Sequence, residues 1–252
     1  MSSVSEQNAQ SYDDHAEEWE ESLKTNVGHK YMEKPAIESL LPNDLTNNSV
    51  LCVGVGSGEE IEEIQERRAS KIVGIDISQG LSDRAKQKFP NTTFIQKDMM
   101  EIASLFEPET FDLVYSSLAF HYSSDWDVLL AGIYTVLKTG GTLVFSTHHP
   151  TYWGTRELDG PVAVNERGIT LTRHKAMLGN IPISYYNHPS EASILESLEY
   201  AGFKNITHFI PPVIEVSSEQ LLLMSDDERS RYERLKEKSG TRALFLVARA
   251  QK

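Results

Sequence analysis

The sequence lacks the features that mark secreted and membrane-spanning proteins. Its 252 residues include one cysteine, Cys52, which excludes an internal disulfide. The start, MSSVSEQNAQ, has neither the basic flank nor the apolar stretch of a signal peptide. No apolar run approaches the ~20 residues that a membrane helix needs. We therefore expect a soluble, cytoplasmic protein of a reducing compartment, in which Cys52 behaves as a small buried apolar residue.

Positive charge is also scarce. The chain has 24 Lys and Arg against 37 Asp and Glu, which gives a formal net charge of −13. Such a surface repels polyanions, and no cluster of Lys and Arg stands out against it. We expect a small-molecule substrate and neither nucleic acid nor membrane as a partner. Composition leaves the oligomeric state open.

What the chain does have, after its first fifty residues, is a regular alternation of short β-branched runs with longer amphipathic stretches. This alternation predicts parallel β-α units, and the length suits one α/β domain over residues 1–252, with residues 1–45 as a helical arm. The predicted strands are Ser49–Val53, Lys71–Ile75, Thr93–Gln96, Asp112–Ser116, Gly141–Thr147, Asn205–Ile210 and Arg242–Ala248.

Two long segments depart from this alternation. Residues 150–188 are longer than a simple crossover and rich in Tyr, Trp and His, so they predict an inserted lid after the fifth strand. Residues 217–240 hold two capping-box candidates, at Ser217 and Ser225, and predict one broken helix or two short ones.

The stretch LCVGVGSGEE, residues 51–60, sets three glycines behind an apolar run and follows them with two glutamates. In the dinucleotide fingerprint G-x-G-x-x-G, counted from Gly54 and Gly56, the third glycine would stand at Glu59. A pyrophosphate at the helix start would meet the carboxylates of Glu59 and Glu60 where it needs positive potential. The loop therefore favours a ligand with positive charge and no phosphate, such as S-adenosylmethionine, over NAD.

Polar side chains end the next strands of the predicted sheet. Asp76 closes the second strand, where a carboxylate can accept hydrogen bonds from both ribose hydroxyls of a nucleoside. Asp98 follows the third strand and could bind an adenine amino group while Met99 packs on the ring. Either aspartate alone is more typical of a turn or a helix cap, but their joint placement favours the ligand. The exit of the fourth strand adds Ser116, Ser117 and His121 to the same edge.

At these residues the sequence resembles the class I S-adenosylmethionine-dependent methyltransferases, most of all their type 11 small-molecule group. The resemblance covers most of the chain and implies a Rossmann-like three-layer sandwich around a seven-stranded, mostly parallel sheet with an antiparallel last strand. It also implies S-adenosyl-L-methionine as the cofactor. The motifs that carry it are VLCVGVGSG, IVGIDIS, FIQKDM, FDLVYSSLAFHY, LKTGGTLVFSTHHP and ISYYNHPSEASILESLEYAGFKNI.

Carried onto this chain, the resemblance implies a set of cofactor contacts. The three glycines would surround the methionine part, Asp76 would bind the ribose, and Ser116 would bind the methionine ammonium. One departure is Cys52, which stands where the family usually has an acidic residue that orders the glycine loop and the ligand's amino group; Glu59 is a candidate to compensate. The implied contacts are Gly54, Gly56, Gly58, Asp76, Ile77, Asp98, Met99, Ser116 and, from an arm that closes over the cofactor in related enzymes, Tyr12.

The sequence therefore predicts a methyltransferase that acts on O, N or C of a small, aromatic or otherwise apolar-bodied molecule. The reaction is an in-line displacement at the sulfonium methyl, to which the enzyme contributes mainly proximity and alignment. One alternative is a catalytically silent binding or scaffold protein of this fold, an idea that rests on Cys52. The other is an NAD-dependent oxidoreductase, against which the failed fingerprint argues.

Two histidines are candidate general bases for a phenol, alcohol or acidic carbon acceptor. His121 follows the fourth strand and His149 the fifth, and we prefer His149. Both could instead cap strand ends or bond the lid. Adjacent His148 and His149 point to opposite faces of an extended segment and have no partner at chelating spacing, so we expect no metal site.

Aromatic side chains provide the candidate substrate contacts, and those in the lid could equally form its core. Tyr12, Ala16, Trp19 and Leu23 form one helical stripe, for which packing against the domain is the alternative to a cofactor contact. The candidate substrate residues are Tyr122, His148, Tyr152, Trp153, Tyr185 and Tyr186.

Overall fold

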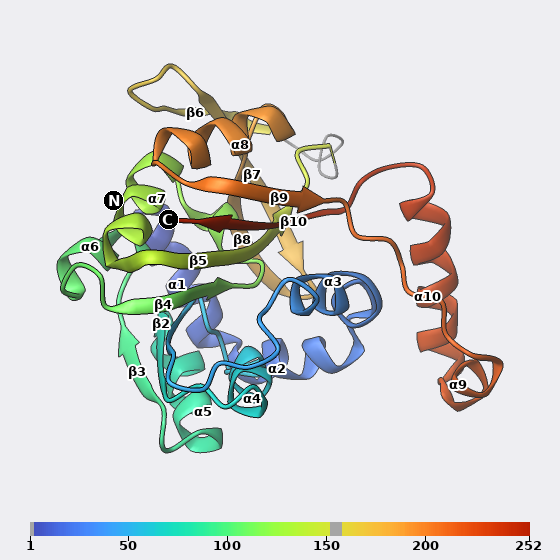
Figure 1. Ribbon diagram of the computed structural model, residues 1–252. Helices are drawn as coiled ribbons and strands as arrows, with labels where there is room; N and C mark the ends of the chain where they lie inside the picture. The colour runs from blue at the N-terminus through green and yellow to red at the C-terminus, as the bar shows by residue number, and fades with distance from the viewer. Residues whose placement is uncertain (1–2, 152–157) are drawn as a thin grey trace.

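The computed structural model describes residues 3–151 and 158–252. Its centre is a seven-stranded sheet of order β3-β2-β1-β4-β5-β10-β9 (Figure 1). The pairs from β3 to β5 are parallel, whereas β10 runs antiparallel to both of its neighbours, so the predicted sheet is confirmed. The strands are β1 (Ser49–Val53), β2 (Lys71–Asp76), β3 (Thr93–Gln96), β4 (Phe111–Ser116), β5 (Leu137–His148), β9 (Lys204–Phe209) and β10 (Phe245–Gln251).

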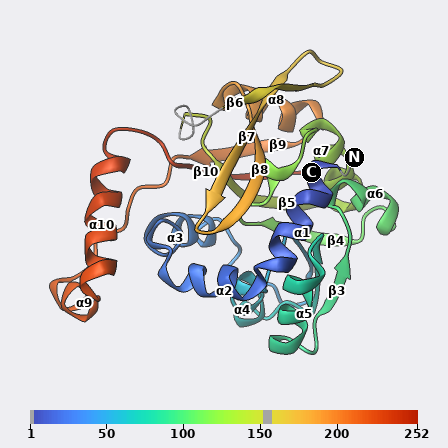
Figure 2. The ribbon, with the colours of Figure 1, turned by 180° about the vertical axis from the view of Figure 1, so that it is seen from behind.

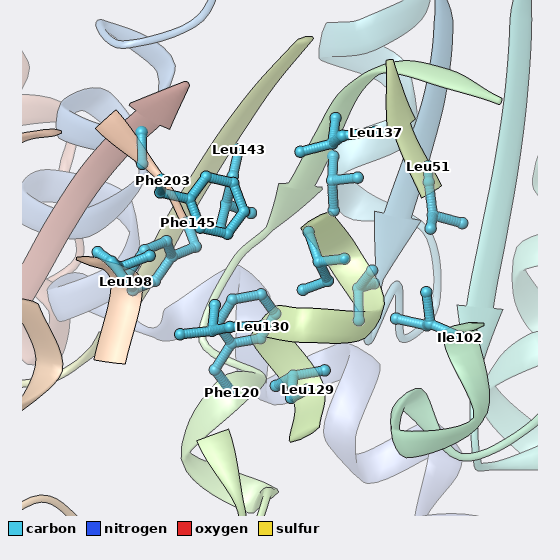
Figure 3. Close-up of a cluster of buried hydrophobic side chains, with 14 of the residues drawn as sticks. Leu51, Ile102, Phe120, Leu129, Leu130, Leu137, Leu143, Phe145, Leu198 and Phe203 are labelled. Atoms are coloured by element: carbon cyan, nitrogen blue, oxygen red, sulfur yellow. The ribbon is translucent and has the colours of Figure 1, made fainter. Parts of the chain in front are cut away.

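Helices cover both faces of this sheet. Side chains alternate between the two faces along each strand, so a single strand contributes residues to the clusters on both faces. In β1, Leu51 packs in the cluster formed with α6, α7 and α8, and Cys52 packs in the cluster formed with α3 and α4. Figure 3 shows the first cluster, where Leu129 and Leu130 of α7 gather with strand residues such as Phe145. The helices are α3 (Lys34–Glu38), α4 (Glu59–Glu66), α5 (Gln79–Lys88), α6 (Ile102–Leu105), α7 (Trp126–Val136) and α8 (Glu191–Tyr200), with 3-10 turns η2 (Met99–Glu101) and η3 (Phe120–Tyr122).

The last strand in the sequence, β10, differs most from its predicted position. It begins at Phe245, which pairs with His148, and continues to Gln251, which pairs with Thr142. The apolar run that suggested an earlier strand ends at Ala248. The neighbouring β5 supplies backbone partners beyond that run, so tertiary pairing and not local preference sets the strand's limits.

Between β5 and α8 the chain forms a second sheet of three antiparallel strands, which were not predicted as strands. Leu178 pairs with Ile181, so Gly179 and Asn180 form a two-residue hairpin turn, and Gly179 has the positive φ of +62° that such turns need. This sheet occupies the predicted lid segment. Its strands are β6 (Leu158–Val164), β7 (Thr170–Leu178) and β8 (Ile181–Asn187).

The N-terminal arm links this lid sheet to the central sheet. In Figure 2, α1 lies beside β8. Asn8 of α1 fixes the contact, because its side chain donates to the Ser184 carbonyl at 2.7 Å and accepts from the Ser184 amide at 2.8 Å. His15 interrupts the predicted helical stripe, and yet the rings of Tyr12 and Trp19 meet edge to face at 5.3 Å. The arm comprises α1 (Val4–Asp14), α2 (Ala16–Thr25) and the π-helix η1 (His29–Glu33), followed by α3.

The segment after β9 forms the two short helices that the capping signals predicted, α9 (Ser218–Leu223) and α10 (Asp226–Ser239), at one side of the sheet (Figure 1). Ser217 forms a full capping box with Gln220. Ser225 accepts from the Glu228 amide, but the Glu228 carboxylate bonds Lys30 and Tyr31 of the arm. Among the described helices, none is long and apolar enough to cross a membrane.

Candidate active site

A cavity opens at the carboxyl ends of β1 and β2, the edge where open parallel sheets bind their ligands. The turns after β1 to β4 form one side, and the N-terminal arm forms the other. The lining brings together these predicted cofactor residues: Tyr12, Gly54, Gly56, Asp76, Ile77, Asp98 and Met99. The remaining lining residues are Ser5, Asn8, Trp19, Leu23, Asn26, His29, Val55, Glu59, Glu60, Ile75, Leu81, Lys97, Ser117, Leu118, Ala119 and Tyr122.

The glycine loop after β1 depends on left-handed backbone at Gly54 (φ +68°) and Gly56 (φ +53°). A Cβ at Gly54 would lie 2.2 Å from Cβ of Ala119, so the β4 exit can pack here only against glycine. A Cβ at Gly56 would point toward the cavity, 3.7 Å from Nε1 of Trp19. The two glycines therefore bring the loop backbone to the cavity surface.

Asp76 ends β2 and ties this loop in place. Its Oδ2 accepts from the Gly56 amide at 2.8 Å, and its Oδ1 accepts from the Ser78 amide at 2.9 Å. Burial raises the pKa of Asp76 above its ordinary value, although these backbone hydrogen bonds oppose that rise. The sequence left open whether Asp76 stabilises a turn or faces a ligand. In the structure its carboxylate does the first and also lines the cavity.

Asp98 and Met99 follow β3 on the same edge. Asp98 caps the 3-10 turn η2, accepting from the Met100 amide at 3.0 Å, and also lines the cavity. Lys97 joins them, which the sequence did not indicate. The charged side chains of the described lining are thus Glu59, Glu60, Asp76 and Asp98 against Lys97. This balance suits a cationic or hydroxylated ligand better than a pyrophosphate.

Aromatic rings wall the cavity on the side of the arm. The hydroxyls of Tyr12 and Tyr122 are 2.5 Å apart, and the two rings meet edge to face at 6.0 Å. Burial raises the pKa of both phenols, that of Tyr122 to about 12, so both stay neutral. Trp19 completes the wall. Tyr122, a candidate substrate residue, therefore lies in the same cavity as the candidate cofactor residues.

Two predicted cofactor residues lie outside the lining. Gly58 is the N-cap of α4, where a Cβ would be 2.9 Å from the ring of Phe89, so it serves packing beneath the loop. Ser116 is buried and donates its hydroxyl to the Val53 carbonyl at 2.9 Å. Its neighbour Ser117 lines the cavity. Successive side chains at the end of β4 point in opposite directions, so Ser116 points into the protein interior and Ser117 toward the cavity.

The three predicted histidines also lie outside the lining. His121 and His148 stack at 4.1 Å between ring centroids. Neither ring nitrogen of His121 has a hydrogen-bond partner among the described residues, and burial lowers its pKa to about 3, so it is a neutral, weak base. His149 turns away from the cavity: its Nδ1 lies 2.8 Å from the Thr151 hydroxyl and its Nε2 3.4 Å from Glu191.

The lid tyrosines pack inside the protein. Tyr185 is fully buried and stacks on His174 at 5.2 Å, with His121 and His148 at its edge. Tyr186 is also buried and alternates to the other face of β8. These tyrosines follow the lid-core alternative. The candidate substrate residues Tyr152 and Trp153 lie outside the described residues.

A histidine–carboxylate pair in the arm was missed by the sequence analysis. His29 lines the cavity, and its Nδ1 is 2.7 Å from Oε2 of Glu33. Glu33 is fully buried and its Oε1 accepts hydrogen bonds from the hydroxyls of Ser117 (3.0 Å) and Ser146. Ser146 in turn accepts from the amide of Leu118, a residue held at φ +49° beside the cavity. The pair is thereby joined to the β4 exit.

The chain has the fold of the class I S-adenosylmethionine-dependent methyltransferases. Residues 51–145 match the family described as a methyltransferase domain, in agreement with the resemblance seen in the sequence. The matched stretch runs from β1 into β5 and holds the glycine loop, Asp76 and Asp98.

Known proteins agree at the level of fold and domain. A solved structure from Listeria monocytogenes, assigned as an S-adenosylmethionine-dependent methyltransferase, superposes with a TM-score of 0.67 at 24% identity, over 92% of this chain and 99% of that one. An uncharacterized Haemophilus influenzae protein is 34% identical over 130 residues, 48% of this chain and 50% of the relative. A malonyl-[acyl-carrier protein] O-methyltransferase of Ilyobacter polytropus is 35% identical over 115 residues, 43% of this chain and 41% of the relative. The chain thus spans about half the length of the curated relatives it matches.

Proposed function

We propose that this protein is an S-adenosylmethionine-dependent methyltransferase that acts on a small molecule. The observation that carries the proposal is the cavity lining, which joins an open glycine loop to the half-buried Asp76 and is rich in carboxylates. S-adenosylmethionine, when bound, supplies an electrophilic methyl group on a sulfonium. The negative lining suits its cationic amino-acid end, and it argues against the pyrophosphate of NAD.

The residues present fit this cofactor. Each oxygen of Asp76 accepts one backbone amide, which leaves acceptor capacity for two ribose hydroxyls. Asp98 and Met99 offer an acceptor and an apolar surface for an adenine ring. Gly54 and Gly56 let the amino-acid end approach the backbone.

The acceptor in this proposal has an aromatic or apolar body. Tyr12, Trp19 and Tyr122 form the wall against which such a body would pack. The accepting atom is O, N or C. Residues 150–188 would act as its lid, since they follow the carboxyl end of β5.

For an acceptor with an ionisable hydroxyl or carbon, we propose His29 as the general base in place of His149 and His121. The contact with Glu33 holds Nδ1 of His29 as the donor, which leaves Nε2 as the acceptor on the cavity side. Glu33 is the positioning residue. A neutral amine acceptor needs no such base, and alignment alone would then suffice.

Ligand-induced stabilisation tests the proposal first. S-adenosylmethionine and S-adenosylhomocysteine should raise the melting temperature, and NADH should leave it unchanged. The reverse pattern would replace the methyltransferase with an oxidoreductase. Methyl-labelled S-adenosylmethionine incubated with a metabolite extract should then transfer the label to one class of molecule, identified by mass spectrometry. Cofactor binding without any transfer would favour a catalytically silent binding protein.

A further inference from the structure

Glu60, the second residue of α4, carries a carboxylate with unmet hydrogen-bonding capacity. It lines the cavity, and its Oε2 is shielded from solvent with no hydrogen-bond partner among residues 3–151 and 158–252. A shielded, unpaired carboxylate oxygen costs free energy that natural structures normally avoid. Such a group is retained where something else supplies the missing donor.

The neighbouring Glu59 is already satisfied. Its Oε1 accepts from the Ser57 hydroxyl at 2.6 Å and from Nζ of Lys88 at 3.1 Å. The two adjacent glutamates therefore differ: Glu59 belongs to a surface ion pair, whereas Glu60 lines the cavity and its Oε2 has no hydrogen-bond partner among the described residues. Because Glu59 is already paired, Glu60 is the better candidate to compensate for the acidic residue that is absent at position 52.

We propose that Glu60 binds the primary ammonium of the ligand's amino-acid end, and so performs in this chain the task that an acidic residue at the Cys52 position performs in the family it resembles. The inference rests on the proposed function. After burial, the Glu60 carboxylate is the second cause that raises the pKa of the Cys52 thiol, so the charge of Glu60 acts on the region that β1 leaves without a carboxylate. An ammonium there would donate to the open oxygen.

Binding should then be linked to a proton. Burial is the largest cause and Glu59 the next, and together they raise the pKa of Glu60 well above its ordinary value, so this carboxylate takes up a proton more readily than a free glutamate does. Around it lie Glu33 on η1, Lys34 on α3, and the neutral Cys52 and Tyr115. Lys34 is directed to Glu38, at 3.6 Å. An arriving ammonium stabilises the carboxylate, and the carboxylic proton passes to the buffer.

The test is calorimetric titration of the full chain with S-adenosylhomocysteine, in two buffers of different ionisation enthalpy. Wild type should release a proton on binding. Glu60→Gln, an isosteric change, should abolish the release and weaken binding about tenfold or more. Glu62→Gln removes the same charge from an exposed position of α4 and should match wild type. 5′-Methylthioadenosine, which lacks the ammonium, should bind wild type and Glu60→Gln equally.

The outcomes separate the two proposals. If wild type binds S-adenosylhomocysteine but releases no proton, or if Glu60→Gln binds it as tightly as Glu62→Gln does, the role of Glu60 is wrong and the methyltransferase proposal stands. If wild type does not bind it at all, the proposed function itself fails. The wild-type proton count needs no variant, so the test holds even if Glu60→Gln folds poorly.

Discussion

The aspartates at or just after the ends of β2 and β3 and the histidines at or just after the ends of β4 and β5 lie at the same edge of the sheet, but with opposite results. Asp76 and Asp98 line the cavity, held by backbone amides. His121 and His148 stack on each other at the edge of the buried Tyr185 ring, outside the lining. The sheet edge places a residue, but the segment that covers it decides whether the residue meets a ligand or becomes core.

Gly54 should be the position most sensitive to a change. In Gly54→Ala, the new Cβ overlaps Cβ of Ala119 at 2.2 Å and the backbone keeps φ +68°, so we expect a loss of about 3 to 5 kcal/mol of unfolding free energy. Gly140→Ala is the control, because its φ is +80° and nothing described lies within 4 Å of its Cβ; it should lose about 1 to 2 kcal/mol. Urea denaturation measures both. Equal losses would mean that the Ala119 contact relaxes freely.

Among the residues that line the cavity, Asp76 should contribute most to the affinity for the ligand. Asp76→Asn keeps one acceptor oxygen but removes the charge, so S-adenosylhomocysteine should bind about ten- to hundredfold more weakly by calorimetry. Asp83→Asn makes the same change at an exposed position of α5 and should have no effect. Unchanged affinity in Asp76→Asn would reduce Asp76 to a turn residue.

The two regions also differ in how far the sequence predicts them. β1 and β3 have their predicted limits because an apolar run and a turn coincide there. The lid strands were missed because their pairing is with one another across a long insertion, which no local pattern reveals. The half-buried position of Glu60 had a signal in the sequence: Glu60 lies one helical turn before the buried Ile64. His29 and Glu33 have the i, i+4 spacing of side chains that can pair along a helix. They pair on a five-residue π-helix, however, which local sequence patterns do not predict.

The buried His121 should make the free energy of unfolding fall as the pH is lowered. Burial lowers the pKa of His121 to about 3 from an ordinary 6.5, so the unfolded chain binds the proton first and stability falls as the pH drops from 6.5 toward 3. At pH 5 this one group should cost up to about 2 kcal/mol. His121→Phe should lose correspondingly less stability between pH 7 and pH 5 in urea denaturation, while His15→Gln on the arm should follow wild type. A variant with the wild-type slope would show that His121 is hydrated.

Glu60 should have a smaller effect on stability, with the opposite dependence on pH. Its folded pKa lies above the unfolded value, so its penalty is absent below about pH 4.5 and grows as the pH rises. Glu60→Gln should therefore gain about 1 kcal/mol over Glu62→Gln at pH 7, and this gain should vanish at pH 4. Thermal melts of the ligand-free proteins measure the difference. A loss at pH 7 would mean that the carboxylate is paired in the free protein.

Hydrogen–deuterium exchange with and without S-adenosylhomocysteine tests most directly that the cavity, and not the buried cluster of His121, His148 and Tyr185, is the cofactor site. We expect slower exchange at residues 54–60, 76–78 and 97–99 and in the arm at 12–26, with the β7 strand at 171–178 unchanged. Slower exchange confined to residues 171–188, or protection by NADH and not by S-adenosylhomocysteine, would show that the cavity is not the cofactor site.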